Sequence, residues 1–326
     1  MTTSLTSPLA LPSARPVRVL SLAGGGFLGL YTAVVLEALE ARAGEPLARR
    51  FDLLAGTSIG AVLALALAYE IPMSQLVHLF REHGPAVFSR RALPRGTLSR
   101  LLDLGRSVLG PKYSGQALRG ALQTHMGGKR LCDALRPLVI PAVDVGLCQT
   151  KVFKTPHALP SQGDGALRAV DVAMAACAAP AYFPAVRLGG RLYADGGLFA
   201  VAPDQVALHE LEHVIGIDQA RISMLSIGTA TSHYRPVEGA HDDAGAVGWM
   251  SNGRLVLTML AVQQQHVQTM VEDRLGERYL RLDADWPLDA GLGIDIATPQ
   301  AIKTLSELAR TTLRDADPRR LASFLS

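Results

Sequence analysis

The stretch FDLLAGTSIGAVLALALAY, residues 51–69, decides the fold class of this chain. Its first part, Phe51–Ala55, is short and apolar and predicts a buried strand, and the apolar run that follows predicts a buried helix. The G-T-S-I-G between them matches a serine on a tight strand-to-helix turn, with glycines that let neighbouring backbone pass close. The apolar part, Leu53–Tyr69, is shorter than the ~20 residues that span a bilayer. The pattern predicts Ser58 as an exposed nucleophile, although a tight turn with a serine N-cap also fits.

The preceding segment has the same arrangement. Arg18–Leu22 predicts a buried strand, and Leu30–Ala43 predicts an almost wholly apolar helix. The loop that joins them contains Gly24, Gly25, Gly26 and Gly29. Glycine-rich loops between a strand and a helix bind anions through backbone N–H groups. A repeated order of strand, glycine-rich turn and helix indicates an α/β sheet with its site at the carboxyl ends of the strands.

A dinucleotide-binding loop is the rival use of these glycines, because Gly24, Gly26 and Gly29 fit the pattern G-x-G-x-x-G. That pattern needs an acidic residue at the end of a second strand, about 20 residues further on. Asp52 stands at a suitable distance, but it begins a strand instead of ending one. Beside an exposed serine, an oxyanion hole is the better use of the loop's N–H groups.

A third signal is Asp195-Gly196-Gly197, directly after a short strand predicted at Arg191–Tyr193. It places a carboxylate at a turn with little steric cover, although an ordinary aspartate turn also fits. Further strands are predicted at Leu138–Asp144, Thr150–Lys154, Ile222–Ile227 and Arg278–Leu282, and helices at Val170–Ala179, Arg254–Leu275 and Pro299–Arg314. The chain shows no repeat and no linker. We therefore expect a flexible arm over residues 1–16 and one domain over 17–326 that includes a helical C-terminal part.

Composition excludes several classes of protein. With 48% hydrophobic and 19% charged residues, the chain is not disordered, and a net charge of +3 with 5% aromatic residues argues against a nucleic-acid partner. The three cysteines are widely spaced and odd in number, which predicts reduced thiols and no disulfide framework or zinc ribbon. They are Cys132, Cys148 and Cys177. The first residues lack a signal-peptide pattern, so we expect a cytoplasmic protein.

Together, GGGFLG at 24–29, GTSIG at 56–60 and DGG at 195–197 resemble the patatin-like phospholipases in order and spacing. Other blocks are also similar to this family, so that the resemblance covers roughly residues 17–320. They are Lys112-Tyr113-Ser114 and residues 139–145, 151–155, 175–184 and 273–283. The resemblance implies a three-layer α/β/α fold, with a mostly parallel central sheet and helices on both faces.

The resemblance also implies a role for each motif. Ser58 matches the nucleophile and Asp195 the base, as a dyad without histidine. The oxyanion loop matches Gly24, Gly25 and Gly26, and the supporting glycines match Gly29, Gly56, Gly60, Gly196 and Gly197. No metal or cofactor is implied. The implied reaction is hydrolysis of carboxylic esters of membrane phospholipids through an acyl-enzyme, by a protein that contacts the membrane transiently.

Two departures from the family pattern stand out. Leu28 occupies a position where the family often has Arg or Lys, and Val201 and Ala202 replace two asparagines that would brace the aspartate loop. We therefore expect other contacts to hold that loop. The F-x-G-L-Y form of the glycine loop and the C-terminal tail resemble bacterial members that act as antiphage effectors activated by a cyclic nucleotide. A cyclic nucleotide activator and a homo-oligomer are thus open as partners.

A zinc metalloprotease is one alternative function. Residues 209–213 read H-E-L-E-H, which places His209 and His213 on one helix face, as zinc binding requires. The stripe that the helix would bury turns both histidines toward solvent, and no third ligand is clear. That stripe comprises Ala207, Leu208, Leu211, Val214 and Ile215.

A Ser-His-Asp α/β-hydrolase esterase is a second alternative, and it needs a histidine after Asp195. The histidines available are His209, His213, His233, His241 and His266. A third alternative is an effector whose lipid site no longer catalyses, but the intact Ser58 and Asp195 argue against it.

Docking on a bilayer needs a surface segment, because a net charge of +3 is too small for purely electrostatic attachment. In the polar segment 89–112, four arginines are interleaved with four leucines. They are Arg90, Arg91, Arg95 and Arg100, and Leu93, Leu98, Leu101 and Leu102. This mixture suits leucines that insert while arginines meet lipid phosphates, although an ordinary solvated loop and helix also fits.

Overall fold

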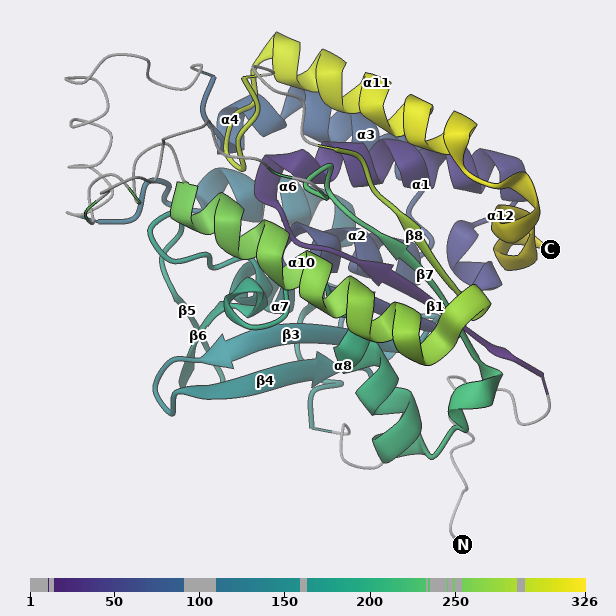
Figure 1. Cartoon of the computed structure of the whole chain (residues 1–326). Coiled ribbons are helices and arrows are strands. Elements are labelled where there is room, and N and C mark those ends of the chain that lie inside the picture. The colour runs from purple at the N-terminus through teal and green to yellow at the C-terminus, as the bar shows by residue number, and fades with distance from the viewer. Residues whose placement is uncertain are drawn as a thin grey trace, which may run out of the picture.

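The computed structural model describes residues 11, 15–90, 110–158, 163–232, 234, 245, 249, 254–285 and 291–326. Within them, eight strands form one sheet in the order β5-β6-β3-β2-β1-β7-β8, and β4 pairs with β3 (Figure 1). The strands are β1 (Val17–Leu22), β2 (Leu53–Gly56), β3 (Leu138–Asp144), β4 (Gln149–Lys154), β5 (Val186–Leu188), β6 (Arg191–Asp195), β7 (Ile222–Ile227) and β8 (Tyr279–Leu282).

The centre of the sheet is parallel, as the sequence predicts. β1 pairs in parallel with β2 and β7, and the parallel order continues to β3 on one side and β8 on the other. The antiparallel strands β4, β5 and β6 lie beyond β2, at the β3 side of the sheet. Leu22 is in register with Gly56 and with Ile227, so three strands reach the same edge together. The loops that follow β1 and β2 therefore lie side by side.

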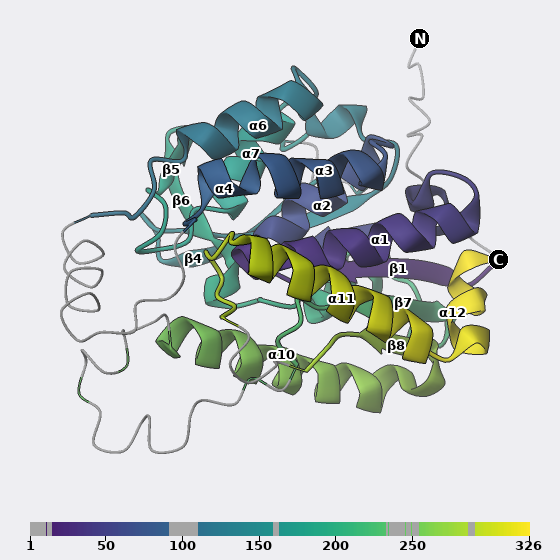
Figure 2. The ribbon, with the colours of Figure 1, turned by 90° about the horizontal axis from the view of Figure 1, so that it is seen from above.

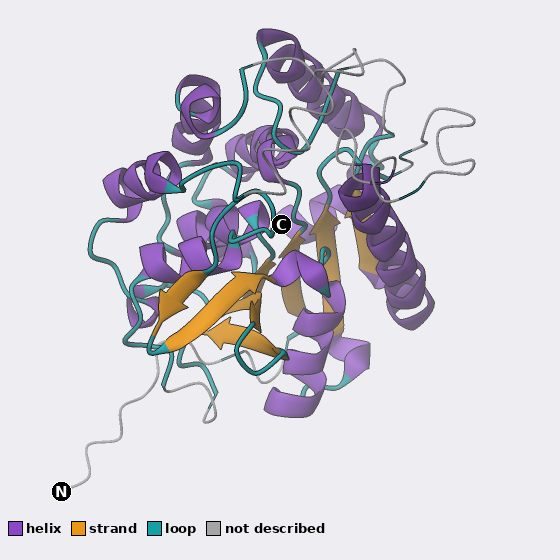
Figure 3. Ribbon diagram, turned by 90° about the vertical axis from the view of Figure 1, so that its left-hand side faces the viewer, coloured by secondary structure: helices purple, strands orange, loops and turns teal. Residues whose placement is uncertain are grey.

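Helices cover both faces of the sheet (Figures 2 and 3). The described α-helices are α1 (Gly29–Ala43), α2 (Ile59–Ala68), α3 (Met73–Glu82), α4 (Gly84–Val87), α6 (Gln116–Met126), α7 (Ala169–Ala176), α8 (Asp204–His209), α10 (Arg254–Leu275), α11 (Pro299–Asp315) and α12 (Pro318–Leu325). Along β1 the side chains alternate: Leu20 and Leu22 enter the core with α1, α2 and α11, while Val17 and Val19 pack with α8 and α10. The predicted three-layer α/β/α fold is confirmed.

Several element bounds differ from the prediction in ways that concern the site. β6 continues through Asp195 instead of ending at Tyr193. α7 ends at Ala176, earlier than predicted, and the carbonyl of Ala178 just beyond it accepts the Asp195 N–H at 3.0 Å. Strand β5 and helix α12 were not predicted, because a three-residue strand and a short terminal helix carry little periodicity.

Parts of the predicted surface segments lie outside the described residues. Of the arginines expected to meet lipid, Arg90 is described and its Nε donates to the Pro85 carbonyl, whereas 91–109 are not described. In the predicted N-terminal arm, the Arg15 guanidinium donates to the Asp52 carboxylate. Among the helices described, none is both long and apolar enough to cross a bilayer.

Gly60 tests how tightly α2 packs on the central strands. A Cβ at this position would lie 2.2 Å from the Leu22 carbonyl oxygen, so Gly60→Ala must push α2 away from β1. We expect a loss of about 1–3 kcal/mol in the free energy of unfolding, measured by urea denaturation. Gly120→Ala is the matched control. Gly120 lies on the exposed face of α6 with open space around it, so that alanine should stabilise by about 0.5–1 kcal/mol. Equal stability of the two variants would contradict this packing.

Candidate active site

Ser58 stands on a strained turn between β2 and α2. Its φ of 54° and ψ of −123° lie in a region that side-chain-bearing residues rarely adopt, a cost typical of functional sites. The turn is held by Thr57, whose N–H donates to the Leu22 carbonyl at 3.1 Å and whose hydroxyl donates to the Ala200 carbonyl at 2.6 Å. A Cβ at Gly56 would lie 2.2 Å from the Gly60 carbonyl oxygen. The glycines of G-T-S-I-G are thus required by close backbone contacts around the serine.

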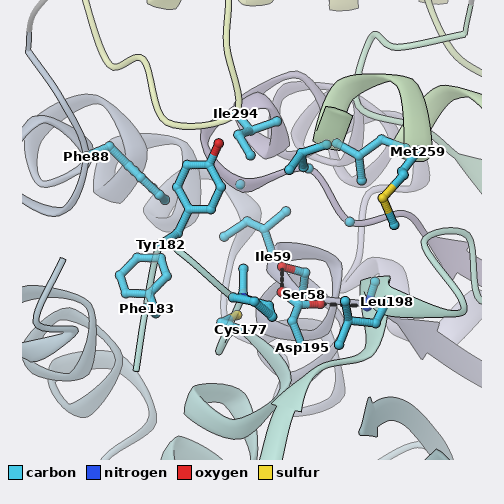
Figure 4. Close-up of a pocket in the computed structure, with 18 of the residues that line it drawn as sticks. Ser58, Ile59, Phe88, Cys177, Tyr182, Phe183, Asp195, Leu198, Met259 and Ile294 are labelled. Carbon is cyan, nitrogen blue, oxygen red and sulfur yellow. Dashed lines mark hydrogen bonds between the residues drawn. The ribbon is translucent and has the colours of Figure 1, made fainter. Parts of the chain in front are cut away.

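The Ser58 hydroxyl meets the carboxylate predicted as its partner. Ser58 Oγ donates to Asp195 Oδ2 at 2.6 Å (Figure 4). The Gly197 N–H donates to the other oxygen, Oδ1, at 2.7 Å. Asp195 is almost fully buried, with 4% of its surface exposed. Because each carboxylate oxygen is oriented by one donor, the geometry aims Oδ2 at the hydroxyl proton.

The surroundings make Asp195 a stronger base than an exposed aspartate. Burial raises the pKa of Asp195 to about 6, although the hydrogen bonds from Ser58 and Gly197 act in the opposite direction. Cys177 lies against the same pair, and burial raises the pKa of its thiol well above the usual value. Cys177 is therefore a neutral thiol and does not compete with Ser58 as a nucleophile.

The glycine loop leaves two N–H groups unused beside Ser58. The N–H groups of Gly24 and Phe27 donate to the carbonyls of Val201 and Ile294. Those of Gly25 and Gly26 donate to no acceptor among the described residues, and both residues line the same cavity as Ser58. Adjacent unused N–H groups suit a developing oxyanion.

Neither loop glycine tolerates a side chain. A Cβ at Gly25 would lie 2.5 Å from Thr229 Oγ1, and one at Gly26 would lie 2.2 Å from the Ile294 carbonyl oxygen. Gly26 also has a φ of 59°. At Gly29, the start of α1, a Cβ would meet the Ile59 side chain at 2.7 Å.

The cavity over Ser58 has a volume of about 180 Å³ and a mostly apolar wall. Phe88, Tyr182 and Phe183 lie on one side of the serine, and Leu198 and Met259 on the other (Figure 4). Such a wall excludes water and accepts hydrocarbon. Serine, carboxylate, two N–H donors and an apolar cavity together suit attack on the ester of a long-chain acid.

A patatin-like phospholipase family model matches residues 20–208. The chain belongs to this family. A cGAMP-activated phospholipase of Pseudomonas aeruginosa is 38% identical to it, over 90% of this chain and 83% of the relative. Proteins of the same description from Vibrio cholerae and Escherichia coli are 32% and 31% identical, each over at least 86% of both chains. The resemblance drawn from the motifs is confirmed, and the chain is a lipid acyl hydrolase.

One departure from the patatin-like pattern is offset by α10. Val201 stands where the family often has asparagine, and its N–H lies 3.4 Å from Gln263 Oε1, while Gln263 Nε2 lies 3.4 Å from the Gly197 carbonyl oxygen. A side-chain amide from a distant helix thus bridges the two ends of the aspartate loop. Sequence reasoning missed Gln263, because nothing local links residue 263 to this loop. Leu28, the other departure, is fully buried in the core.

The H-E-L-E-H motif has another role in this patatin-like chain. His209 and His213 are exposed, as expected, and their ring centroids lie 5.0 Å apart. Glu210 points inward, where it accepts a hydrogen bond from Lys154 and contacts His157 Nε2 at 3.1 Å. In the part of the chain that the structure describes, no group of three or more side chains could hold a metal ion. The motif glutamate serves a buried ion pair, and the metalloprotease alternative is not supported.

The described histidines do not lie where the Ser-His-Asp esterase alternative needs one. Among the described residues that line the cavity, none is a histidine. His209, His213 and His266 are exposed, and His233 and His241 lie outside the described residues. Asp195, which a triad would pair with histidine, instead contacts Ser58 directly.

The raised pKa of Asp195 predicts two pH effects with opposite signs. Hydrolysis of a soluble ester should rise with pH through about 6, because only the ionised carboxylate accepts the proton. The contribution of Asp195 to the free energy of unfolding should fall as the pH rises from about 4 to about 6. Since unfolded aspartate has a pKa of about 4, the folded state holds the proton more tightly, and its stability declines as the proton leaves.

Asp195→Asn should remove this contribution, so that the free energy of unfolding of wild type relative to the variant falls between about pH 4 and pH 6, measured by urea denaturation at several pH values. A difference between wild type and Asp195→Asn that stays flat through that range, or a rate that does not rise through about pH 6, would contradict the assignment of a raised pKa to Asp195.

Proposed function

We propose that this chain hydrolyses carboxylic esters of membrane phospholipids through a dyad of Ser58 and Asp195. The observation that carries the proposal is the 2.6 Å hydrogen bond from Ser58 Oγ to a buried carboxylate, next to unused N–H groups at Gly25 and Gly26. Serine becomes a nucleophile when a base removes its proton, and Asp195 is the group in contact with it. Membership of the patatin-like family supports the same residues.

In the first half-reaction, Ser58 Oγ attacks the carbonyl carbon of the ester while its proton passes to Asp195. The carbonyl oxygen becomes an oxyanion, which accepts hydrogen bonds from Gly25 and Gly26. Loss of one such donor typically costs about 10²–10³ in turnover. As the tetrahedral intermediate collapses, the bond to the leaving oxygen breaks. Asp195 returns the proton to that oxygen, and the lysophospholipid leaves.

The second half-reaction uses the same groups in the same order. A water molecule attacks the acyl-Ser58 carbonyl and gives a proton to Asp195, and the Gly25 and Gly26 N–H groups again hold the oxyanion. Collapse breaks the bond to Ser58 Oγ, which takes the proton back, and a fatty acid leaves. The apolar cavity holds the acyl chain through both halves.

The proposal extends to partners and place of action. The relatives named above as cGAMP-activated phospholipases match nearly the whole chain. These names support a cyclic nucleotide as the activator. The resemblance of the glycine loop and the C-terminal tail to antiphage effectors extends the proposal to that role, in the cytoplasm. A bilayer substrate requires transient membrane contact, and activation by a small ligand is compatible with a homo-oligomer.

Ser58→Ala and Asp195→Asn should each reduce hydrolysis of a p-nitrophenyl ester to background, because members of a catalytic unit lose similar amounts when changed singly. Circular dichroism should show an unchanged fold for both. Single substitution of any of the nine histidines should leave substantial turnover. A histidine variant as inactive as Ser58→Ala would replace the dyad by a triad.

Addition of cGAMP should accelerate fatty-acid release from vesicles by roughly 5–150-fold, the range typical of coupling between two sites. The full chain is assayed on mixed phosphatidylcholine and phosphatidylglycerol vesicles. The linear dinucleotide of the same bases serves as the control, and Ser58→Ala with cGAMP gives the blank. Equal rates with and without cGAMP would remove the activator from the proposal and leave the hydrolase in place.

A further inference from the structure

Five large apolar side chains are exposed on α10 and in the aspartate loop, two elements that line the catalytic cavity, and we call them the rim patch. Leu255, Met259 and Val262 recur on α10 at spacings of four and three residues, which places them on one helix face. Leu198 and Phe199 lie within the aspartate loop, between Gly197 and Val201. The exposed fractions are 44% for Leu198, 36% for Phe199, 40% for Leu255, 38% for Met259 and 59% for Val262.

The rim patch is continuous with the cavity wall. Leu198 and Met259 belong to both, since they line the cavity and are also exposed (Figure 4). Their neighbours Val256 and Leu260 on α10 line the cavity as well. One face of α10 therefore closes the cavity, and an adjacent face extends it onto the surface. An acyl chain would pass from outside to Ser58 along apolar side chains throughout.

The charge pattern of α10 suits an anionic surface. From Arg254 to Met270 the helix contains no acidic residue, and its first acidic residue is Glu272. A helix face of this kind meets lipid phosphates without repulsion. Solvent-exposed apolar side chains gathered on one surface mark an interaction site.

We propose that the rim patch is the surface on which this enzyme docks to a phospholipid bilayer, with its apolar side chains entering the boundary between headgroups and acyl chains. This inference rests on the proposed function, because it takes a bilayer phospholipid as the ligand of the cavity. Membrane binding of such a surface scales with the apolar area it buries. We take the bilayer as the ligand of the patch, since the patch borders the cavity that the phospholipid must enter.

Leu255 and Val262 are the residues to change, because neither lines the cavity. Leu255→Gln and Val262→Gln are made singly and together. Leu135→Gln is the matched control, because Leu135 has a similar exposed fraction, 49% against 40% for Leu255. Leu135 precedes the amino end of β3, at the edge of the sheet away from Ser58. Substitutions at exposed positions should leave the free energy of unfolding within about 0.5 kcal/mol of wild type.

The full chain is tested for cosedimentation with vesicles of equal parts phosphatidylcholine and phosphatidylglycerol, with and without cGAMP. We expect the double variant to bind about tenfold more weakly, each single variant to bind a few-fold more weakly, and Leu135→Gln to bind like wild type. Hydrolysis of vesicle lipid should fall in parallel with binding. Hydrolysis of p-nitrophenyl butyrate, which is soluble and needs no docking, should be equal in all variants.

Unchanged vesicle binding by the double variant would overturn the docking surface. Loss of a wild-type dimer in sedimentation velocity, with vesicle binding retained, would overturn it too and assign the patch to contact between two copies of the chain. Failure of the proposed function looks different: wild type would then hydrolyse neither the soluble ester nor the vesicles. Cosedimentation needs no turnover and still decides the docking surface. If the double variant unfolds, the single variants carry the same comparison.

Discussion

The hydrogen bond between Ser58 and Asp195 joins residues 137 positions apart in the sequence, and much of the architecture serves to bring them together. Ser58 follows a central parallel strand, whereas Asp195 ends β6, which pairs antiparallel with β3. A Cβ at Gly196 would lie 2.4 Å from the Pro141 carbonyl oxygen on β3. The carboxylate thus reaches the serine because the loop after β6 presses directly on the neighbouring strand.

The oxyanion loop depends on parts of the chain beyond the segment that the family model matches, which ends at residue 208. The Thr229 hydroxyl donates to the Gly24 carbonyl at 3.3 Å, and the Ile294 carbonyl accepts the Phe27 N–H at 2.7 Å. Asp283 in turn holds the loop that contains Thr229, because its carboxylate accepts hydrogen bonds from the N–H groups of Ala230 and Thr231. The proposed catalytic residues lie within the matched segment, but the loops after β7 and β8 hold the oxyanion loop in position.

Short sequence patterns were sufficient to predict those parts of the site that each lie within one continuous segment of the chain. The strand, turn and helix around Ser58, the glycine loop and the strand before Asp195 all carry short-range signals of periodicity and glycine spacing. Contacts between distant segments carry no such signal. Gln263 bridges the aspartate loop from a long helix, and Glu210 turns inward because Lys154 and His157 lie beneath it. Partners of this kind become visible only when the sheet order is known.

Helix α10 combines functions that are separate in the sequence. Leu260 forms cavity wall, Gln263 bridges the aspartate loop, and Gln264 donates to Thr231 in the loop that supports Gly24. Met259 lines the cavity and is exposed at its mouth. All these residues fall within two turns, so any displacement of α10 acts on the carboxylate, on the oxyanion loop and on the entrance at once. Because burial is what raises the pKa of Asp195, the wall that receives the acyl chain also tunes the base that cleaves it.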